Sequence, residues 1–382
     1  MEKQFNLLAG MVNKWHASLD ASGKPATFAL QLKGRPPRVY GGGEPAFTLV
    51  VNDESGLKAL SSLDGTTVIE AYMSGALDVE GDLTAALSLR EMFTDRHPLR
   101  HLWRFVRPLL FGQVKSDAGW IQQHYDYDAD FYLLFLDRDH RCYSQGVFED
   151  DGEPLEAGIR RKLDFAFESA GLKPGDSVLD IGAGWGAFAQ YAGRRGVKVT
   201  SLTISEASEK FVNALIEREN LPCRVVREHL LAYSPGERYD AVVNMGVTEH
   251  LPDYRATLAK YRELLRPGGR VYLDASASRV KHEGHSFIYR HIFPGNGSFW
   301  CLHDYLAQLA ATPFRLRAVH DDRHSYYLTT KYWAENLDRN REEVARRWGK
   351  ALYRKFQIYL WGSTKGFQDD DLQAYRAVLE MP

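Results

Sequence analysis

The segment Val178-Leu-Asp-Ile-Gly-Ala-Gly-Trp-Gly186 gives the clearest indication of the fold. Its first residues are apolar, and they predict a buried strand that ends at Asp180. The glycines Gly182, Gly184 and Gly186 allow a tight turn, in which the backbone approaches a ligand at the start of the next helix. A strand, a glycine loop and a helix in this order predict the first unit of an α/β domain that binds a nucleotide-like ligand.

The segments around this loop alternate between helix and strand. A helix with one apolar face ends at Gly171, and further strands are expected over 197–202, 224–226, 241–245 and 271–275, with helices between them. This alternation predicts a doubly wound, mostly parallel sheet. Arg315–Val319 and Tyr326–Thr330, separated by a polar turn, predict an antiparallel hairpin that closes the sheet.

The residues at the ends of the first two strands indicate which ligand the loop binds. A dinucleotide site has an acidic residue at the end of the second strand, but Leu202-Thr-Ile-Ser205 places hydroxyl groups there. The carboxylate of Asp180 would repel a pyrophosphate, whereas it suits the ammonium of an amino-acid cofactor. S-adenosylmethionine (SAM) carries such an ammonium and NAD does not. The sequence therefore favours SAM and the Rossmann-like fold of the class I SAM-methyltransferases.

The chain is long enough for more than one domain. We expect a small α+β domain over 1–110, a linker and active-site lid over 111–155, and the methyltransferase domain over 156–382. Residues 90–115 and a predicted helix over 339–355 are locally basic. Each is either an amphipathic helix packed on the body of the protein or a patch that contacts anionic lipid headgroups.

Composition narrows the class of protein and the compartment. The 48 Lys and Arg nearly balance the 50 Asp and Glu, for a net charge of −2 over 382 residues, which gives no indication of nucleic-acid binding. The three cysteines are far apart and indicate reduced thiols. No signal peptide or membrane-spanning stretch is evident, so we expect a cytoplasmic protein. The histidines of 282–291 lack ligand spacing, so no metal is expected.

Further motifs, taken together, resemble the cyclopropane-fatty-acyl-phospholipid synthase family, which includes the mycolic acid cyclopropane synthases. The motifs are His124-Tyr-Asp126, Asp130-Phe-Tyr132, Phe135-Leu-Asp137, Tyr143-Ser144, Lys173 to Gly186, Leu202 to Ser205, Asn244 to His250 and Phe287 to Pro294. The resemblance implies SAM-dependent transfer of a methyl or methylene group to a double bond of an unsaturated phospholipid acyl chain. It also implies an N-terminal domain that serves lipid binding or homodimerisation, with a peripheral contact at the inner membrane face.

The resemblance assigns the cofactor contacts position by position. Besides Asp180 and the glycine loop with Gly182, Gly184 and Gly186, they are Tyr143 and Ser144 for the methionine part, Thr203 and Ser205 for the adenosine side, and Gly246 at the end of the fourth strand. The family has a Gln where this chain has Ser208, so the ribose contact at that place is altered.

The proton-removing site departs from the family pattern. In the family a bicarbonate ion acts as the base, and this chain keeps two of the positions that hold it, as Glu249 and Tyr326. The family's Cys, His and Ile are replaced by Gln145, Asp274 and Ser276. Two carboxylates in one cavity repel an anion. We therefore predict that bicarbonate is not used and that Asp274 or Glu249 takes the proton itself.

Other interpretations remain open from the sequence. Asp274 can simply cap a loop, and Gln145 can bond to backbone. His124 and Asp126 can order the lid or form a buried polar pair. The altered base site also fits a C-methyltransferase for a specialised metabolite. A lipid-binding protein that kept SAM but lost catalysis is a third class, against which the intact Asp180, glycine loop and Glu249 argue.

Overall fold

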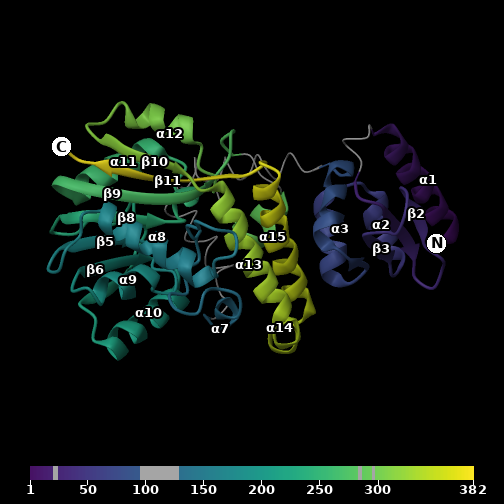
Figure 1. Ribbon diagram of the computed structural model, residues 1–382, viewed down its shortest axis with the longest axis horizontal. Helices are drawn as coiled ribbons and strands as arrows, with labels where there is room; N and C mark the ends of the chain where they lie inside the picture. Colours follow the sequence, from purple (N-terminus) through teal and green to yellow (C-terminus); the bar gives the residue numbers. More distant parts are fainter. Residues whose placement is uncertain (20–24, 95–128, 283–285, 295–296) are drawn as a thin grey trace. The chain divides into compact units, whose positions relative to one another are not determined.

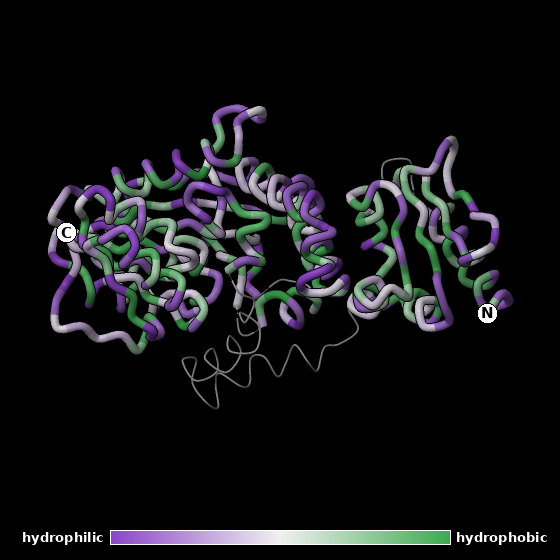
Figure 2. Tube along the Cα trace, turned by 90° about the horizontal axis from the view of Figure 1, so that it is seen from below, coloured by the Kyte–Doolittle hydropathy of each residue, from purple (hydrophilic) through white to green (hydrophobic). Residues whose placement is uncertain are grey.

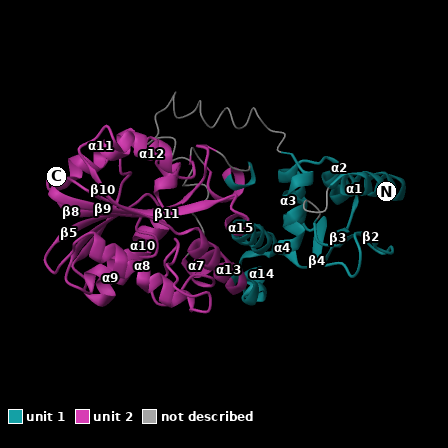
Figure 3. Ribbon diagram, turned by 45° about the horizontal axis from the view of Figure 1, so that its top comes forward, with its two compact units in different colours: residues 1–101, 285–288, 337–365 teal, residues 102–284, 289–336, 366–382 magenta. Residues whose placement is uncertain are grey.

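The computed structural model describes residues 1–19, 25–94, 129–282, 286–294 and 297–382. His124 and Asp126, and most of the basic stretch 90–115, lie outside these ranges. The chain divides into two compact units (Figure 3). Unit 1 contains Met1–His101, His285–Ile288 and Leu337–Lys365, and unit 2 contains Leu102–Gly284, Tyr289–Asn336 and Gly366–Pro382.

The N-terminal part of unit 1 is a four-stranded sheet with helices. The sheet order is β2-β1-β3-β4, with β1 and β3 parallel and the other pairs antiparallel. Its elements are α1 (Glu2–Ser18), β1 (Phe28–Leu32), β2 (Arg38–Tyr40), β3 (Phe47–Val51), α2 (Glu54–Ser61), α3 (Gly65–Ser74), β4 (Leu77–Gly81), α4 (Leu83–Ala86) and η1 (Leu87–Met92). The Asp64 side chain caps the start of α3 by accepting a hydrogen bond from the amide of Thr67.

The C-terminal part of unit 1 consists of α14 (Arg341–Trp348) and α15 (Lys350–Gln368), the latter through Lys365. The expectation of one basic helix over 339–355 was wrong. Gly349 has a φ of +92°, a left-handed conformation that ends α14 and separates the two helices. Arg354 of α15 packs into the unit and does not face solvent, since its side chain is 17% exposed.

Arg354 joins α15 to the N-terminal part of unit 1. Its Nη1 donates to the backbone oxygens of Tyr72, at 2.7 Å, and Leu77, at 3.3 Å. Its Nη2 lies 2.5 Å from a carboxylate oxygen of Asp78. The hydroxyl of Tyr72 donates in turn to Gln357 at 2.6 Å. Segments that are distant in the sequence thus share one polar contact region.

Replacing Arg354 with Met should loosen this contact. The change leaves two carbonyls and a carboxylate without their donor, at a cost of about 2 kcal/mol. Amide hydrogen exchange in β4 and α15 should therefore be faster by roughly thirtyfold. Arg346→Met is the control, because the Arg346 side chain is 71% exposed and its ion pair is with Glu343 of its own helix. Equal exchange in the two variants would contradict the assignment.

Unit 2 contains a seven-stranded sheet of order β10-β11-β9-β8-β5-β6-β7. Its strands are β5 (Ser177–Ile181), β6 (Lys198–Thr203), β7 (Cys223–Arg227), β8 (Tyr239–Met245), β9 (Leu265–Ala277), β10 (Arg315–Asp321) and β11 (Gln373–Glu380). The five strands from β9 to β7 are parallel, and β11 runs antiparallel to both of its neighbours. The prediction of a doubly wound, mostly parallel sheet is confirmed.

Helices cover both faces of this sheet. The helices α8 (Leu155–Ser169), α9 (Ala187–Gly193) and α10 (Glu206–Glu219) lie on one face, and α11 (Tyr254–Leu264) and α12 (Leu302–Leu309) lie on the other (Figures 1 and 3). A large apolar cluster fills the space between β8, β9, α11 and α12, with Trp300 and Tyr305 fully buried in it. Green, hydrophobic stretches of the tube gather in the interior of this part of the chain, and purple, hydrophilic ones lie mainly on its outside (Figure 2).

The antiparallel strands close the sheet as expected, but the partner strand was predicted wrongly. Arg315–Val319 lies in β10, which pairs with β11 and not with Tyr326–Thr330. The latter segment belongs to α13 (Arg323–Arg339). Its β-branched residues suggested a strand, yet the hydroxyl of Thr329 donates to the carbonyl of Ser325 one helical turn earlier. No helix in the described ranges is long and apolar enough to span a membrane.

Candidate active site

A pocket opens at the carboxyl ends of β5, β6 and β8. In this sheet β5 lies between β6 and β8, so the pocket is at the topological switch point where doubly wound folds bind ligands. Most of the residues predicted for the cofactor line this one pocket: Tyr143, Ser144, Asp180, Gly182, Gly184, Thr203, Ser205 and Gly246.

Gly182 and Gly186 of the loop each exclude a side chain, but for different structural reasons. Gly182 has a φ of +88°, and a Cβ there would lie 2.4 Å from Cγ2 of Val247. Gly186 is not among the lining residues; a Cβ there would meet Leu215 of α10 at 2.6 Å. Gly182 therefore shapes the pocket, and Gly186 lets the start of α9 pack closely against α10.

Asp180 is a buried carboxylate in the pocket. It is 2% exposed, and its Oδ2 accepts a hydrogen bond from the hydroxyl of Ser201 at 2.7 Å. Burial raises the pKa of Asp180 to about 7, although the bond from Ser201 and the charge of Lys162 act in the opposite direction. A cation that enters the pocket would relieve this desolvation by pairing with the carboxylate.

The side chain of Ser208 faces the glycine loop. Its hydroxyl donates to the carbonyl oxygen of Gly184 at 2.7 Å, and its backbone amide donates to the hydroxyl oxygen of Ser205 at 3.3 Å. The residue that replaces the family's Gln therefore supports the loop.

The wall that carries Tyr143 and Ser144 is held by two residues that sequence reasoning did not assign a role. The buried carboxylate of Asp137 accepts hydrogen bonds from the amides of His140 and Cys142, both at 2.7 Å. The guanidinium of Arg141 donates to the carbonyl of Trp185 at 3.2 Å. Asp137 lies within the motif Phe135-Leu-Asp137, so its polar end was the available signal.

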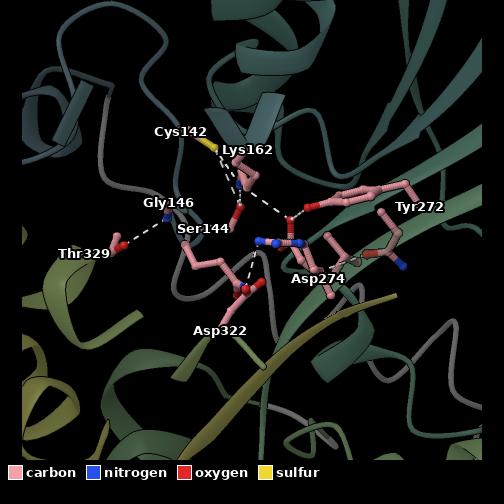
Figure 4. A network of polar contacts seen from close by, with 12 residues as sticks. Cys142, Ser144, Gly146, Lys162, Tyr272, Asp274, Asp322 and Thr329 are labelled. Carbon is pink, nitrogen blue, oxygen red and sulfur yellow. Dashed lines mark hydrogen bonds and ion pairs between the residues drawn. The ribbon is translucent and has the colours of Figure 1, made fainter. Parts of the chain in front are cut away.

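A second group of polar residues lies behind this wall (Figure 4). Lys162 projects from α8 and is fully buried. Its Nζ lies 2.5 Å from Oγ of Ser144, 3.1 Å from Sγ of Cys142 and 3.6 Å from Oδ2 of Asp274. The hydroxyl of Tyr272 donates to the same Oδ2 at 2.9 Å. The predicted Asp274 is therefore one half of a buried ion pair.

The buried cation was missed by sequence reasoning, although a signal existed. Lys162 follows Ile159 by three residues and precedes Leu163, both of which are fully buried. A lysine on the apolar face of an amphipathic helix is rare unless its charge is paired. The charge of Asp274 keeps the pKa of Lys162 raised, even though burial acts against it.

Gln145 lies in a neighbouring chain of contacts. Its Nε2 donates to Oδ2 of Asp322 at 2.8 Å, and Nη1 of Arg376 donates to Oδ1 of the same carboxylate at 2.8 Å. Burial raises the pKa of Asp322 to about 6, and the charge of Arg376 partly offsets this. Because Arg376 of β11 stands opposite Asp274 of β9 in the strand register, the two ion pairs are adjacent.

Glu249 lies in the short helix η2 (Thr248–His250), after β8. Its Oε1 accepts hydrogen bonds from the amide and the hydroxyl of Ser276, at 2.8 and 2.7 Å. Its Oε2 is buried and has no hydrogen-bond partner among the described residues. Burial raises the pKa of Glu249 to about 7, and the nearby charge of Asp274 adds to the effect.

Tyr326 lies beside this group on α13. Its amide donates to the carbonyl oxygen of Asp322 at 2.8 Å, and its ring stacks on Phe367 with 4.5 Å between centroids. The structure thus places Gln145 and Asp274 in adjacent groups of buried polar contacts, and it bonds Glu249 to Ser276, two residues beyond Asp274 in β9, so that the three lie in one polar region. Tyr326 joins it through the backbone of Asp322.

The residues of the pocket fit SAM. The glycine cradle has no room for a side chain at Gly182, and Asp180 offers a buried carboxylate for an ammonium. The hydroxyl oxygens of Thr203 and Ser205 accept backbone N–H bonds at 3.1 and 3.3 Å, which leaves both hydroxyl protons able to donate to a ligand.

The sheet order and this pocket are those of the class I SAM-dependent methyltransferases. Residues 113–377 match the model of the mycolic acid cyclopropane synthetase family. The chain therefore belongs to that family, which confirms the resemblance read from the motifs.

The chain is similar to lipid-modifying proteins. It is 26% identical to a sphingolipid C9-methyltransferase of Candida albicans over 82% of this chain and 65% of that protein. It is 27% identical to a probable fatty acid methyltransferase of Pseudomonas putida over 89% of both chains. The crystal structure of a mycolic acid cyclopropane synthase with SAH and CTAB has 25% identity and a TM-score of 0.64, and it covers 69% of this chain and 98% of that one. This chain thus spans about two thirds of the length of the sphingolipid relative.

The pKa of Asp180 makes the binding of S-adenosylhomocysteine (SAH), the demethylated cofactor, dependent on pH. Below about pH 7 the carboxylate is protonated, and it must lose that proton to pair with the ammonium of the ligand. The affinity measured by calorimetry should therefore fall as pH is lowered from 8 to 6, by about tenfold. Asp180→Asn should bind weakly at both pH values. A wild-type affinity that does not change with pH would refute this role.

Proposed function

We propose that this protein transfers the methyl group of SAM to a carbon–carbon double bond of an unsaturated lipid acyl chain and then removes a proton. When bound, SAM supplies an electrophilic methyl group activated by its sulfonium. Gain of CH₃⁺ and loss of H⁺ add one CH₂ to the lipid, as a cyclopropane, a methylene group or a methyl-branched alkene. The family and the lipid relatives support the reaction class.

The observation that carries the proposal is the free oxygen of Glu249. Oε1 is fixed by Ser276, while Oε2 is buried without a partner in the described part of the chain. A base needs an unshared oxygen and a pKa near the working pH, and Glu249 has both. Oδ1 of Asp274 also lacks a partner among the described residues, but the charge of Asp274 is already paired with the ammonium of Lys162. We therefore assign proton removal to Glu249 and not to Asp274.

A bound bicarbonate is not needed in this arrangement. Glu249, Asp274 and Asp322 contribute three carboxylates, against the two cations Lys162 and Arg376. A further anion would enter a region whose net charge is already negative, and its burial would add a desolvation cost. The side chain of Ser276, at a position where the resembled family has Ile, already occupies one oxygen of Glu249.

The proposal includes a cytoplasmic enzyme that meets its substrate at a membrane surface and acts as a homodimer. The exposed Arg346 of α14 provides one positive group for anionic headgroups. Flotation with anionic vesicles and analytical ultracentrifugation test these two parts separately from the chemistry. A C-methyltransferase for a specialised metabolite would ignore vesicles.

The reaction itself is tested with SAM and vesicles of unsaturated phospholipid. Mass spectrometry should detect acyl chains heavier by one CH₂, and NMR should identify the product. Glu249→Gln should lower the rate by at least about a hundredfold, because the amide cannot accept the proton. Its affinity for SAH should stay near that of the wild type. Glu217→Gln is the control, because it makes the same change at a glutamate of α10 that has no role in the proposed reaction. Full activity of Glu249→Gln would rule out this base.

Activity should be independent of bicarbonate and should rise with pH. Degassed, bicarbonate-free buffer should leave the rate unchanged, because the base is a side chain. As pH falls through about 7, Glu249 becomes protonated and the rate should decline about tenfold per pH unit. Measurement at saturating SAM separates this effect from the titration of Asp180. A rate restored by added bicarbonate would contradict the proposal.

A further inference from the structure

Lys162 is a buried cation that the reaction as described does not use. Its side chain is 0% exposed, and a lone ammonium in that position would be costly. Its Nζ donates to Ser144 Oγ at 2.5 Å and to Cys142 Sγ at 3.1 Å, and it forms an ion pair with Asp274 Oδ2 at 3.6 Å (Figure 4). Two of these acceptors line the cofactor pocket, and the third belongs to the base region.

We propose that Lys162 is a positioning residue for proton removal: it keeps Asp274 as a carboxylate beside Glu249 and ties that carboxylate to the wall of the cofactor pocket. The inference rests on the proposed function for its catalytic meaning. The contacts on which it stands are independent of that function.

The negative charge of Asp274 depends on Lys162. The carboxylate is 0% exposed, and its Oδ1 has no hydrogen-bond partner among the described residues. Burial alone raises its pKa, and Lys162 is the largest influence in the opposite direction. Without the ammonium, Asp274 would take up a proton, since an unpaired buried charge costs several kcal/mol.

The negative charge of Asp274 in turn affects the protonation of Glu249. A negative charge at Asp274 repels the negative form of Glu249 and so increases the affinity of Glu249 for a proton. Among the described residues, the charged and titratable groups that act on the two carboxylates or are affected by them include Lys162 from α8, Tyr272 from β9, Arg376 from β11, Asp322 before α13 and Tyr254 from α11. Of these, Lys162 has the direct ion pair with Asp274 at 3.6 Å.

Lys162 also contacts the wall of the cofactor pocket. The ammonium of Lys162 holds Ser144 and Cys142, which lie on the pocket wall with Tyr143. Loss of the ammonium should disturb this wall, whereas loss of the Asp274 charge should not. The two ends of the Lys162 contact can therefore be separated by mutation.

The experiment titrates Glu249 by infrared difference spectroscopy, with Glu249→Gln as the reference for its carboxyl band. The variants are Lys162→Met, Asp274→Asn and the double variant. Arg160→Met removes a positive charge from an exposed position of the same helix and serves as the control. The expected midpoint is about 7 in the wild type and in Arg160→Met. It should be lower in both single variants, by less than burial raises it, and no lower in the double variant than in the single ones.

A second measurement tests the pocket end of the contact. Lys162→Met should weaken SAH binding severalfold, while Asp274→Asn should leave it unchanged. If Lys162→Met does not fold, comparing the double variant with Asp274→Asn decides the question, because the double variant leaves no unpaired charge. The midpoints of these two should agree, and the affinity for SAH should be lower in the double variant.

A Glu249 midpoint that stays at the wild-type value in Lys162→Met, or in Asp274→Asn, would overturn the inference. So would shifts that add in the double variant. The infrared titration needs no turnover, so the outcomes are distinguishable. Shifted midpoints without any product from unsaturated lipid would refute the proposed function alone. Lipid turnover with an unchanged Glu249 midpoint would refute the role of Lys162 alone.

Discussion

The ion pair between Lys162 and Asp274 is the constraint on which the rest of the site depends. Both side chains are fully buried, so each charge has lost its hydration, at a cost of several kcal/mol that only the partner offsets. The pair joins α8 to the end of β9, and through Ser144 it also fixes the pocket wall. Segments near residues 144, 162 and 274 must therefore fold together for any of these charges to be satisfied.

The topology of the sheet extends this constraint. Because β11 inserts antiparallel beside β9, Arg376 stands opposite Asp274 in the register. Arg376 then pairs with Asp322, which accepts a further bond from Gln145. Asp322 comes directly after β10 and begins the long insertion of α13 to α15 that separates β10 from β11. The edge of the sheet that departs from parallel pairing is thus the edge that supplies the second buried ion pair.

The sequence predicted the parts of the molecule that local pattern determines. The glycine loop, the alternation of strands and helices and the pocket residues near Asp180 follow from spacing alone, and most of those residues do line one pocket. The segment 326–330 was misassigned because its β-branched residues favour a strand locally, while its hydroxyls and tertiary packing favour a helix. The long-range partners of these residues could not be predicted from local sequence pattern.

The missing partners explain why the base site could be located but not understood from the sequence. Sequence reasoning treated Asp274 and Glu249 as two carboxylates in one cavity. It omitted Lys162, whose place on an apolar helix face was visible, and Arg376, whose relation to Asp274 depends on strand register. The role of a buried charged side chain can be inferred only when its counter-charge is known. In each case here the counter-charge is a residue of another helix or strand.

The departures from the resembled family form a set and not independent changes. Gln145 bonds to Asp322, Asp274 pairs with Lys162, and Ser276 holds Glu249. Restoring a single family residue would remove a contact that this site uses: a histidine at position 274 would face the ammonium of Lys162, and an isoleucine at 276 would remove the hydroxyl that donates to Oε1 of Glu249 and leave only the backbone amide there. A site that supplies its own carboxylates must also supply their cations, whereas a site that binds an external anion must leave room for it. The buried contacts around Glu249 and Asp274 correspond to the first arrangement, which is the physical basis for assigning proton removal to the protein itself.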